Sequence, residues 1–271
     1  MKAFSLLFFL IIFEITNAQK NEYYLELIQN FDENQISCWN IDAFENLILA
    51  DQSSLKKINS NGQTTYKVSN KSYGELKQII PITPMKILLF SEQQQQICFL
   101  DNTLTQVENC IDLDIYNIDF ATITARSGRG DQLWIFDQIN SKIILADLRN
   151  PGKILQEIRN LKGLIQLEDI LNMIEFQSEL FILDSENKLS KFDLYGNLLS
   201  QEKLEFSQMS CSDNSMWMLK SNQLFSRNDD EMIPLNCFIP IDVIENFRFN
   251  DSRFYFQQGN QIQVFNLVKK K

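Results

Sequence analysis

Histidine is absent from this chain of 271 residues, and its absence limits the chemistry that the chain can perform. Without imidazole there is no Ser-His-Asp or Cys-His nucleophile pair, no histidine acid–base catalysis, and no zinc or iron site with a histidine ligand. The five cysteines form no CxxC pair, which argues against a zinc site built from thiolates. We therefore interpret the protein as non-catalytic.

Oxygen-bearing side chains are the remaining candidates, because Asp, Asn and Glu oxygens are the ligands that calcium prefers. Five of them fall in segments that we predict below to be the innermost strands of a repeated sheet, where they would line a central channel. No spacing signature marks them as a metal site. These candidate channel ligands are Asn40, Asp42, Asp119, Asn172 and Glu175.

The segment Arg126-Ser-Gly-Arg129-Gly-Asp131 places two arginines on a glycine-containing loop within an acidic chain. Arg126 and Arg129 could grip a carboxylate or phosphate of a partner through paired N–H groups. The alternative is a loop with solvated arginines, and the composition of the segment favours that alternative.

The cysteine count is odd, and simple buried thiols are the interpretation that we favour. If the compartment is oxidising, the best disulfide candidate is Cys98 with Cys110, because both fall on neighbouring strands of one predicted hairpin.

The N-terminus has the features of a secretory signal peptide: a basic residue at Lys2, an apolar stretch from Leu6 to Ile15 that is interrupted by Glu14, and a small residue, Ala18, before Gln19. The apolar stretch is shorter than the roughly 20 residues that a membrane-spanning helix needs. We expect residues 1–18 to be cleaved, and the mature chain to be exported to the periplasm, the cell surface or the medium without a transmembrane segment.

The formal net charge is −10, and no basic stripe offsets it. An acidic chain repels phosphate backbones, so nucleic acid is not an expected partner.

A repeated phrase indicates which elements position these residues. Its clearest copy runs from Glu179 to Gly196 and contains an apolar strand ending in Asp184, a turn, a second strand ending in Asp193, and a glycine turn. Six copies begin about 36 to 47 residues apart, the period of a four-stranded propeller blade.

Three columns of residues are shared by the six copies. The first is large and apolar, the second ends the first strand, and the third ends the second strand and holds only Asp or Asn. Because the acidic residues of the second column recur with the repeat, we expect them to cap turns. The columns are Ile48, Leu89, Trp134, Phe181, Trp217 and Phe254; Asp51, Glu92, Asp137, Asp184, Lys220 and Gln257; and Asn59, Asp101, Asp147, Asp193, Asn228 and Asn266.

Each copy needs an innermost strand before the phrase and an outermost strand after it. We predict innermost strands at Ile36–Asp42, Gln78–Ile82, Ile118–Thr124, Ile170–Phe176, Met209–Ser212 and Val243–Phe249. We predict outermost strands at Thr64–Val68, Thr105–Ile111, Ile154–Ile158, Leu198–Leu204 and Met232–Phe238.

The sixth copy has no outermost strand of its own before Lys271, and the strand-like segment Tyr23–Ile28 is otherwise unassigned. Pairing the two would close the ring and remove the open sheet edges of a linear array. We therefore predict an all-β, six-bladed β-propeller over residues 19–271, whose last blade is completed by the N-terminal strand of the mature chain.

From Phe181 to Gly196 the chain resembles the six-bladed propellers of the NHL and related bacterial families, whose blades share an apolar strand, Asp, a turn, and a second apolar strand ending in Phe-Asp-x-x-Gly. This resemblance implies the fold and leaves the activity open.

Two functions fit these features. We favour an exported, non-catalytic scaffold that binds other proteins in a membrane-associated complex and needs no cofactor. In a double-membraned bacterium this would be an accessory subunit of outer-membrane assembly or secretion machinery. The alternative is a calcium-dependent, lactonase-like hydrolase or a sugar-binding propeller that uses the channel oxygens.

Overall fold

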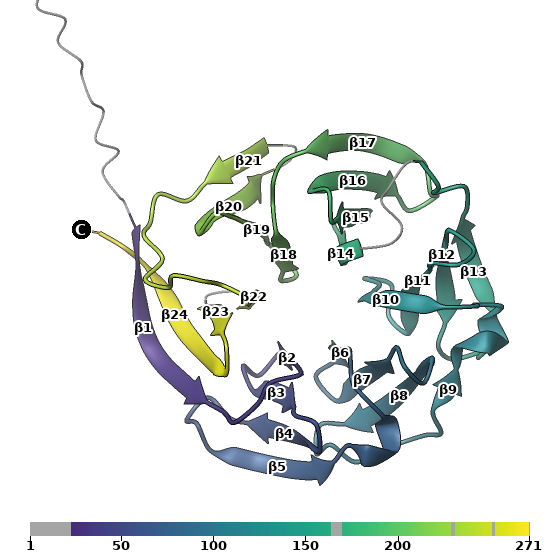
Figure 1. The fold of residues 1–271 in the computed structure, drawn as a ribbon, viewed down its shortest axis with the longest axis horizontal. Helices are drawn as coiled ribbons and strands as arrows, with labels where there is room; N and C mark the ends of the chain where they lie inside the picture. Colours follow the sequence, from purple (N-terminus) through teal and green to yellow (C-terminus); the bar gives the residue numbers. More distant parts are fainter. Residues whose placement is uncertain (1–22, 164–169, 229–230, 251–252, 271) are drawn as a thin grey trace, which may run out of the picture.

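A computed structural model describes residues 23–163, 170–228, 231–250 and 253–270 of the protein. These residues form six four-stranded antiparallel sheets arranged as the blades of a ring around a common centre (Figure 1). The predicted six-bladed propeller is confirmed. The predicted signal peptide, residues 1–18, lies outside the described residues. Within those residues we find no helix that has the length and apolar character to cross a membrane.

Each blade begins with its innermost strand, and in blades 1 to 5 the chain then moves outward strand by strand. Blade 1 has β2 (Cys38–Ile41), β3 (Leu47–Ala50), β4 (Ser54–Ile58) and β5 (Thr64–Ser69); blade 2 has β6 (Gln78–Thr83), β7 (Lys86–Ser91), β8 (Gln96–Asp101) and β9 (Ile111–Asp112); blade 3 has β10 (Ala121–Arg126), β11 (Gln132–Asp137), β12 (Lys142–Asp147) and β13 (Ile154–Ile158). Blade 4 has β14 (Ile170–Phe176), β15 (Glu179–Asp184), β16 (Lys188–Asp193) and β17 (Leu198–Lys203); blade 5 has β18 (Gln208–Cys211), β19 (Met216–Lys220), β20 (Gln223–Asn228) and β21 (Glu231–Pro234). Two short 3-10 helices, η1 (Lys71–Tyr73) and η2 (Leu113–Tyr116), lie between blades.

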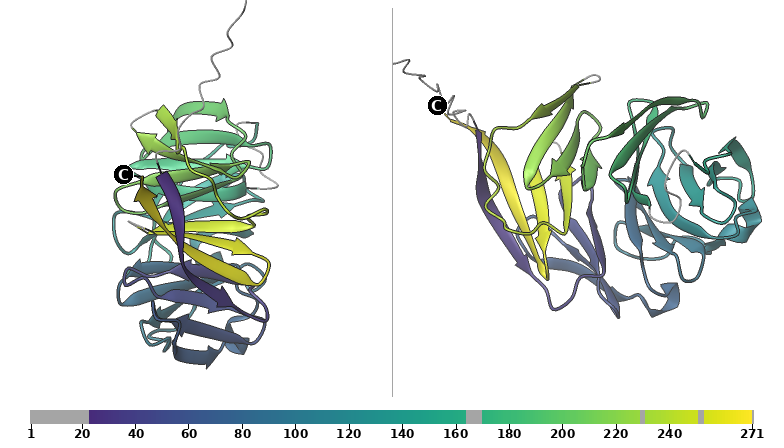
Figure 2. Two further views of the ribbon diagram at one scale, coloured as in Figure 1. Left: turned by 90° about the vertical axis from the view of Figure 1, so that its left-hand side faces the viewer. Right: turned by 45° about the horizontal axis from the view of Figure 1, so that its top comes forward.

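Blade 6 is built from both ends of the described chain. Its strands are β22 (Asn246–Asn250), β23 (Arg253–Gln258), β24 (Gln261–Lys269) and, outermost, β1 (Tyr23–Asp32). The β1–β24 pairing extends from Tyr23 opposite Lys269 to Asp32 opposite Gln261. Figure 2 shows β1 lying along β24 at the ring closure. The predicted closure of the ring by the N-terminal strand is therefore confirmed.

Apolar side chains of the second and third strands fill the spaces between blades. All six members of the first column are buried, from Ile48 to Phe254. In blade 6 the aromatic rings of Phe254 and Phe256 stack, and Trp217 from blade 5 packs edge-on against Phe254 at 4.9 Å between ring centroids. Contacts of this kind join each blade to the next and make the ring continuous.

The Asp residues of the second and third columns cap turns, as their recurrence predicts, whereas Glu92 of the second column forms an ion pair with Lys77. Asp184 accepts hydrogen bonds from the backbone N–H groups of Glu186 and Lys188, and Asp193 accepts them from Tyr195 and Asn197. The same pattern occurs at Asp51, Asn59, Asp101 and Asp147.

The predicted outermost strand Thr105–Ile111 is largely wrong, because β9 contains only Ile111 and Asp112. After β8 the chain leaves the sheet: Leu104 adopts a φ of 64° and is buried, and only the isolated bridge between Leu100 and Gln106 remains.

The innermost strands of blades 3 and 6 also begin later than predicted, at Ala121 and Asn246. In both cases apolar residues of the preceding connection, such as Ile118 and Ile241, are buried without belonging to a strand.

Candidate functional site

The six innermost strands surround the axis of the ring (Figure 1), a region that we call the central channel, and side-chain hydrogen bonds link some of these strands to their neighbours. Asn40 on β2 donates its Nδ2 hydrogen to the carbonyl oxygen of Ile79 on β6, at 2.7 Å. Asn172 on β14 does the same to Met209 on β18, at 3.0 Å. Two of the five predicted calcium ligands therefore link neighbouring blades.

Asp119 lies at the other end of the channel from Asp42 and Glu175. It precedes β10, where its carboxylate accepts a hydrogen bond from Asn140 at 2.9 Å, whereas Glu175 is near the end of β14 and Asp42 follows β2. A strand of six residues spans about 20 Å. The five candidate ligands are therefore not brought together, and the described residues contain no group of three or more acidic or cysteine side chains placed to hold a metal ion.

Asp42 instead shapes the loop between β2 and β3. It is buried and forms an ion pair with the equally buried Lys57, at 2.8 Å. The carboxylate also accepts hydrogen bonds from the backbone N–H groups of Phe44 and Asn46 and from the Asn46 side chain. This network fixes a tight loop that leaves the Phe44 side chain 59 % exposed.

Glu175 has the same role for the arginine loop of blade 3. Its Oε1 accepts a hydrogen bond from the backbone N–H of Gly128 at 3.1 Å, and its Oε2 accepts one from the indole Nε1 of Trp134 at 2.5 Å. The predicted ligand therefore fixes the segment between Arg126 and Arg129, both of which are exposed.

The loops that follow the innermost strands lie at one end of the channel, because all six of these strands run in the same direction along the axis of the ring. Arg126 of blade 3 approaches Asp213 of blade 5 at 4.0 Å, and Asn250 of blade 6 donates to the carbonyl oxygen of Asp42 in blade 1 at 3.4 Å. We call this end of the molecule the inner-loop face.

On the inner-loop face, three consecutive blades present exposed apolar and basic side chains. Blade 1 presents Phe44, blade 2 presents Met85, which is also 59 % exposed, and blade 3 presents the two arginines. The Arg129 guanidinium lies 5.7 Å from the ring of Trp134, which orients it. We define these four residues, Phe44, Met85, Arg126 and Arg129, as the docking patch.

Sequence reasoning identified the arginines of this patch and missed Phe44 and Met85. The available signal was a large apolar residue at the centre of a polar turn, in Asp-Ala-Phe-Glu-Asn and in Thr-Pro-Met-Lys. Such a residue cannot enter the core from a tight hairpin, so it faces solvent.

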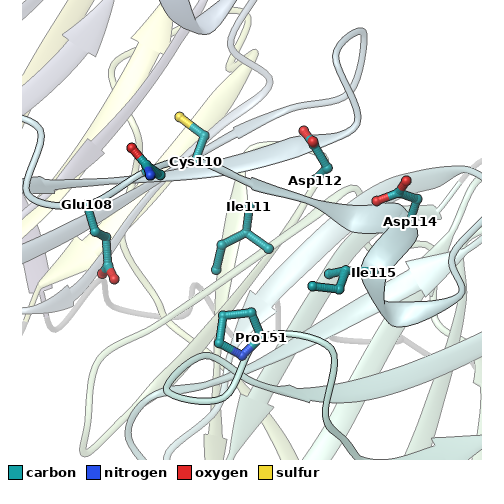
Figure 3. A pocket seen from close by; sticks show the side chains of 8 residues that line it. Glu108, Cys110, Ile111, Asp112, Asp114, Ile115 and Pro151 are labelled. Carbon is teal, nitrogen blue, oxygen red and sulfur yellow. The ribbon is translucent and has the colours of Figure 1, made fainter.

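A second feature is a groove of about 640 Å³ on the outer side of blades 2 and 3 (Figure 3). Ile111, Ile115 and Pro151 form its apolar part, and Glu108, Asp112 and Asp114 surround them. Glu108 forms an ion pair with Lys86 at 2.8 Å.

The wall of this groove contains a disulfide between Cys98 and Cys110. These are the two cysteines that the sequence offers as the best candidate pair, although simple buried thiols are the interpretation favoured there. Cys110 lies in the loop just before β9 and not on a strand, so the bond ties that loop to β8.

Comparisons with known proteins yield structural matches only. No family model and no curated protein sequence matches the chain. The WD40 domain of Neurospora crassa Pan2 is similar over 93 % of this chain and 98 % of its own, with a TM-score of 0.64 and 7 % identity. Virginiamycin B lyase from Staphylococcus aureus is similar over 91 % of this chain and 100 % of its own, with a TM-score of 0.60 and 11 % identity.

PorZ from Porphyromonas gingivalis is also similar, over 87 % of this chain and 32 % of its own, with a TM-score of 0.56 and 9 % identity. The protein is a β-propeller. At these identities the likeness shows the fold alone, and the similar proteins include both an enzyme and a component of a secretion system.

Proposed function

We propose that this β-propeller is an exported, non-catalytic scaffold that binds a partner protein through the docking patch on its inner-loop face. The observation that carries the proposal is the exposure of Phe44 and Met85 beside Arg126 and Arg129 on three consecutive loops. Aromatic residues, methionine and arginine are the types enriched in protein–protein interfaces.

The networks beneath the patch support this role. Asp42 and Glu175 fix the loops that carry Phe44 and the arginines, so little conformational entropy is lost when a partner binds. Because the protein is acidic overall, the arginines form a local basic site in a negative surface. The partner surface that fits it combines carboxylates with an apolar pocket.

Export is supported by two independent features. The N-terminal sequence has a basic residue, an apolar stretch and a small residue before Gln19. The Cys98–Cys110 disulfide is a bond that persists in oxidising compartments and is rare in reducing ones.

We further propose that, in a double-membraned bacterium, the partner belongs to outer-membrane assembly or secretion machinery. PorZ, whose propeller is similar to this one, is an essential bacterial surface component of a type-IX secretion system. That similarity makes a membrane-associated complex the first place to look for the partner.

Matched double variants test the docking patch. Phe44→Ser with Arg129→Glu changes one exposed apolar residue and one exposed arginine of the patch. Ile139→Ser with Arg159→Glu changes the same residue classes on the loops at the opposite end of the channel, where both side chains are exposed. Cells expressing each protein are cross-linked, the envelope fraction is solubilised, and captured proteins are identified by mass spectrometry.

We expect a reproducible partner with the wild type and with the Ile139/Arg159 variant, and its loss with the Phe44/Arg129 variant. Equal capture by the two variants would place binding elsewhere and contradict the docking patch. Recovery of only free monomer, with the wild-type protein as well, would contradict the scaffold function itself.

A further inference from the structure

Arg248 lies in the central channel, on β22 of blade 6. The strand alternates strictly: Phe247 and Phe249 are buried in the core between blades 5 and 6, whereas Asn246, Arg248 and Asn250 are only partly buried. Arg248 and Asn250 contact Trp39 and Asp42 of blade 1. Arg248 therefore places a guanidinium inside the ring, near the end opposite the docking patch.

The positive charge of Arg248 is not matched by a carboxylate in the described part of the chain. Its Nη1 donates to Asn246 Oδ1 at 2.5 Å and to the carbonyl oxygen of Phe247 at 2.8 Å, and the guanidinium lies 5.5 Å from the Trp39 ring. Nε and Nη2 have no acceptor among the described residues. A guanidinium fork with unused donors is suited to bind two oxygens of an anion at once.

Two free thiols, Cys38 on β2 and Cys211 on β18, lie near enough to interact electrostatically with the guanidinium, and Cys38 lines the same cavity as Arg248. Burial raises the pKa of both thiols to about 12, although the positive charge of Arg248 opposes the rise for Cys38, and the charges of Arg126 and Arg248 oppose it for Cys211. Burial lowers the pKa of Arg248 to about 10. At neutral pH the thiols are therefore uncharged and the arginine is charged, so the thiols do not neutralise it.

A partly buried cation without an opposite charge is costly, because desolvation is not repaid by an ion pair. Arg248 lines a cavity of about 130 Å³ between blades 6, 1 and 2. That volume corresponds to about four water molecules at liquid density, enough for an ion of four or five heavy atoms. Ser37 and Lys77 add a hydroxyl and an ammonium group to its lining, the ammonium being paired with Glu92 at 2.6 Å.

We propose that this cavity is a binding site for a small oxyanion, held by the Arg248 guanidinium with Ser37 and Cys38 beside it. The ligand must present two negatively charged oxygens to the guanidinium, and inorganic phosphate, sulfate and a small carboxylate such as acetate all do so. The site is separate from the docking patch and does not depend on the proposed scaffold function.

Thermal unfolding in the presence of each anion tests the site. Phosphate, sulfate and acetate are added to the full mature protein at constant ionic strength, with chloride as the reference salt. We expect a saturable rise in Tm with at least one oxyanion, since a ligand that binds only the folded state stabilises it. The anion that acts at the lowest concentration shows whether the site prefers a tetrahedral ion or a carboxylate.

Variants of Arg248 test whether the rise in Tm depends on its guanidinium. Arg248→Gln should abolish the rise in Tm, and Arg248→Lys should weaken it, because an ammonium keeps the charge but loses the paired N–H groups. Arg149→Gln removes an exposed arginine from the outer side of blade 3 and should leave the rise unchanged. A rise of equal size in Arg248→Gln would overturn the proposal.

Alkylation of the wild-type protein supplies a readout that does not require a variant to fold. Cys38 lines the cavity, whereas the thiol of Cys237 lies outside it. Burial raises the pKa of both thiols, so labelling is slow and is followed over hours at alkaline pH, with the anion-free wild-type rate as reference. With the anion at ten times its Kd, labelling of Cys38 should slow about tenfold further, because only the unoccupied fraction reacts, and labelling of Cys237 should not change. No shift in Tm with any oxyanion relative to chloride, together with unchanged labelling of Cys38, would also overturn the proposal.

Discussion

The carboxylate of Glu175 accepts a hydrogen bond from the indole Nε1 of Trp134 at 2.5 Å, across the boundary between blades 4 and 3. Trp134 belongs to the apolar first column and is fully buried, so its N–H group has no access to water. The other Glu175 oxygen holds the backbone of Gly128. One side chain on the channel thus satisfies a core residue and fixes the loop of the docking patch.

Replacement of Glu175 should therefore cost stability. Glu175→Ala leaves the buried Trp134 N–H without an acceptor, and we expect a loss of about 1–3 kcal/mol in the free energy of unfolding. Glu175→Gln keeps one acceptor oxygen and should lose less. Urea unfolding followed by tryptophan fluorescence measures both. Glu186→Ala, at an exposed position of the next turn, should change stability by no more than about 0.5 kcal/mol. Equal midpoints for Glu175→Ala and wild type would show that this hydrogen bond contributes nothing.

The repeat predicts most of the strands, because alternation and the Asp and Asn columns are local signals, but it misplaces the outermost strands of blades 2 and 5, since β9 contains only Ile111 and Asp112 and β21 ends at Pro234. The closure by Tyr23–Ile28 followed from counting strands. The roles of Asp42 and Glu175 could not be predicted in this way. Placing Glu175 on an innermost strand is a local inference, but its partner Trp134 lies 41 residues away on another blade, and their contact depends on how the blades pack.

At the edge of blade 2 the local sequence predicts a strand that the structure does not form. Thr105–Ile111 has the composition of a strand, yet the turn after Asp101 and the buried Leu104 direct the chain away from β8. Leu104 has a positive φ, and its side chain is buried in the core. This conformation depends on the space between the packed strands and not on the residues next to Leu104 in the sequence.

Calcium distinguishes the scaffold from the alternative enzyme or sugar-binding function. Asn172 and Glu175 hold a neighbouring strand and a loop through their hydrogen bonds, and the described residues contain no group of three or more acidic or cysteine side chains placed to hold a metal ion. We expect millimolar calcium to leave Tm unchanged relative to magnesium. A rise in Tm that is specific for calcium and is lost in Asn172→Ala or Glu175→Ala would establish a channel calcium site and revive the alternative.

The Cys98–Cys110 disulfide closes a short loop, since the two cysteines are 12 residues apart. The disulfide restricts the unfolded chain, so removal of the bond should lower the free energy of unfolding by about 3 kcal/mol. The double variant Cys98→Ala with Cys110→Ala should therefore unfold at lower urea than wild type, and a reductant should destabilise the wild type but not the variant. Cys237→Ala is the control, because Cys237 is a free thiol. Five free thiols in protein purified from its host without reductant would contradict the bond.

Acid should destabilise the protein in a defined range, because turn-capping hydrogen bonds lower the pKa of several aspartates. Burial alone would raise the pKa of Asp51, but hydrogen bonds from Ser54 and Ser53 outweigh it and lower the pKa from 3.8 to about 2. The pKa values of Asp101, Asp147 and Asp193 are lowered mainly by side-chain hydrogen bonds from Thr103, Asn150 and Asn197.

A carboxylate with a lowered pKa in the folded state stabilises that state above its unfolded pKa, and this contribution is lost as the pH falls through the folded value. We expect Tm to be insensitive to these groups above about pH 5 and to fall between about pH 4 and pH 2. Asp51→Asn should reduce the slope in that range, and Asp112→Asn, at an exposed position of the groove, should not. If Tm falls with pH equally steeply in both variants, the acid sensitivity belongs to other groups.

Ring closure by β1 is tested by two leucines of the same strand. Leu25 is 9 % exposed and packs in the blade 6 core, whereas Leu27 is 54 % exposed. Leu25→Ala should lower the free energy of unfolding by about 2–4 kcal/mol, because it removes buried methyl groups and leaves a cavity between β1 and its neighbours. Leu27→Ala should change it by less than about 0.5 kcal/mol. Both variants keep the backbone pairing with β24, so the difference between them measures the packing of the N-terminal strand against the last blade. If the two variants unfold at the same urea concentration, β1 does not pack on the ring in the way described.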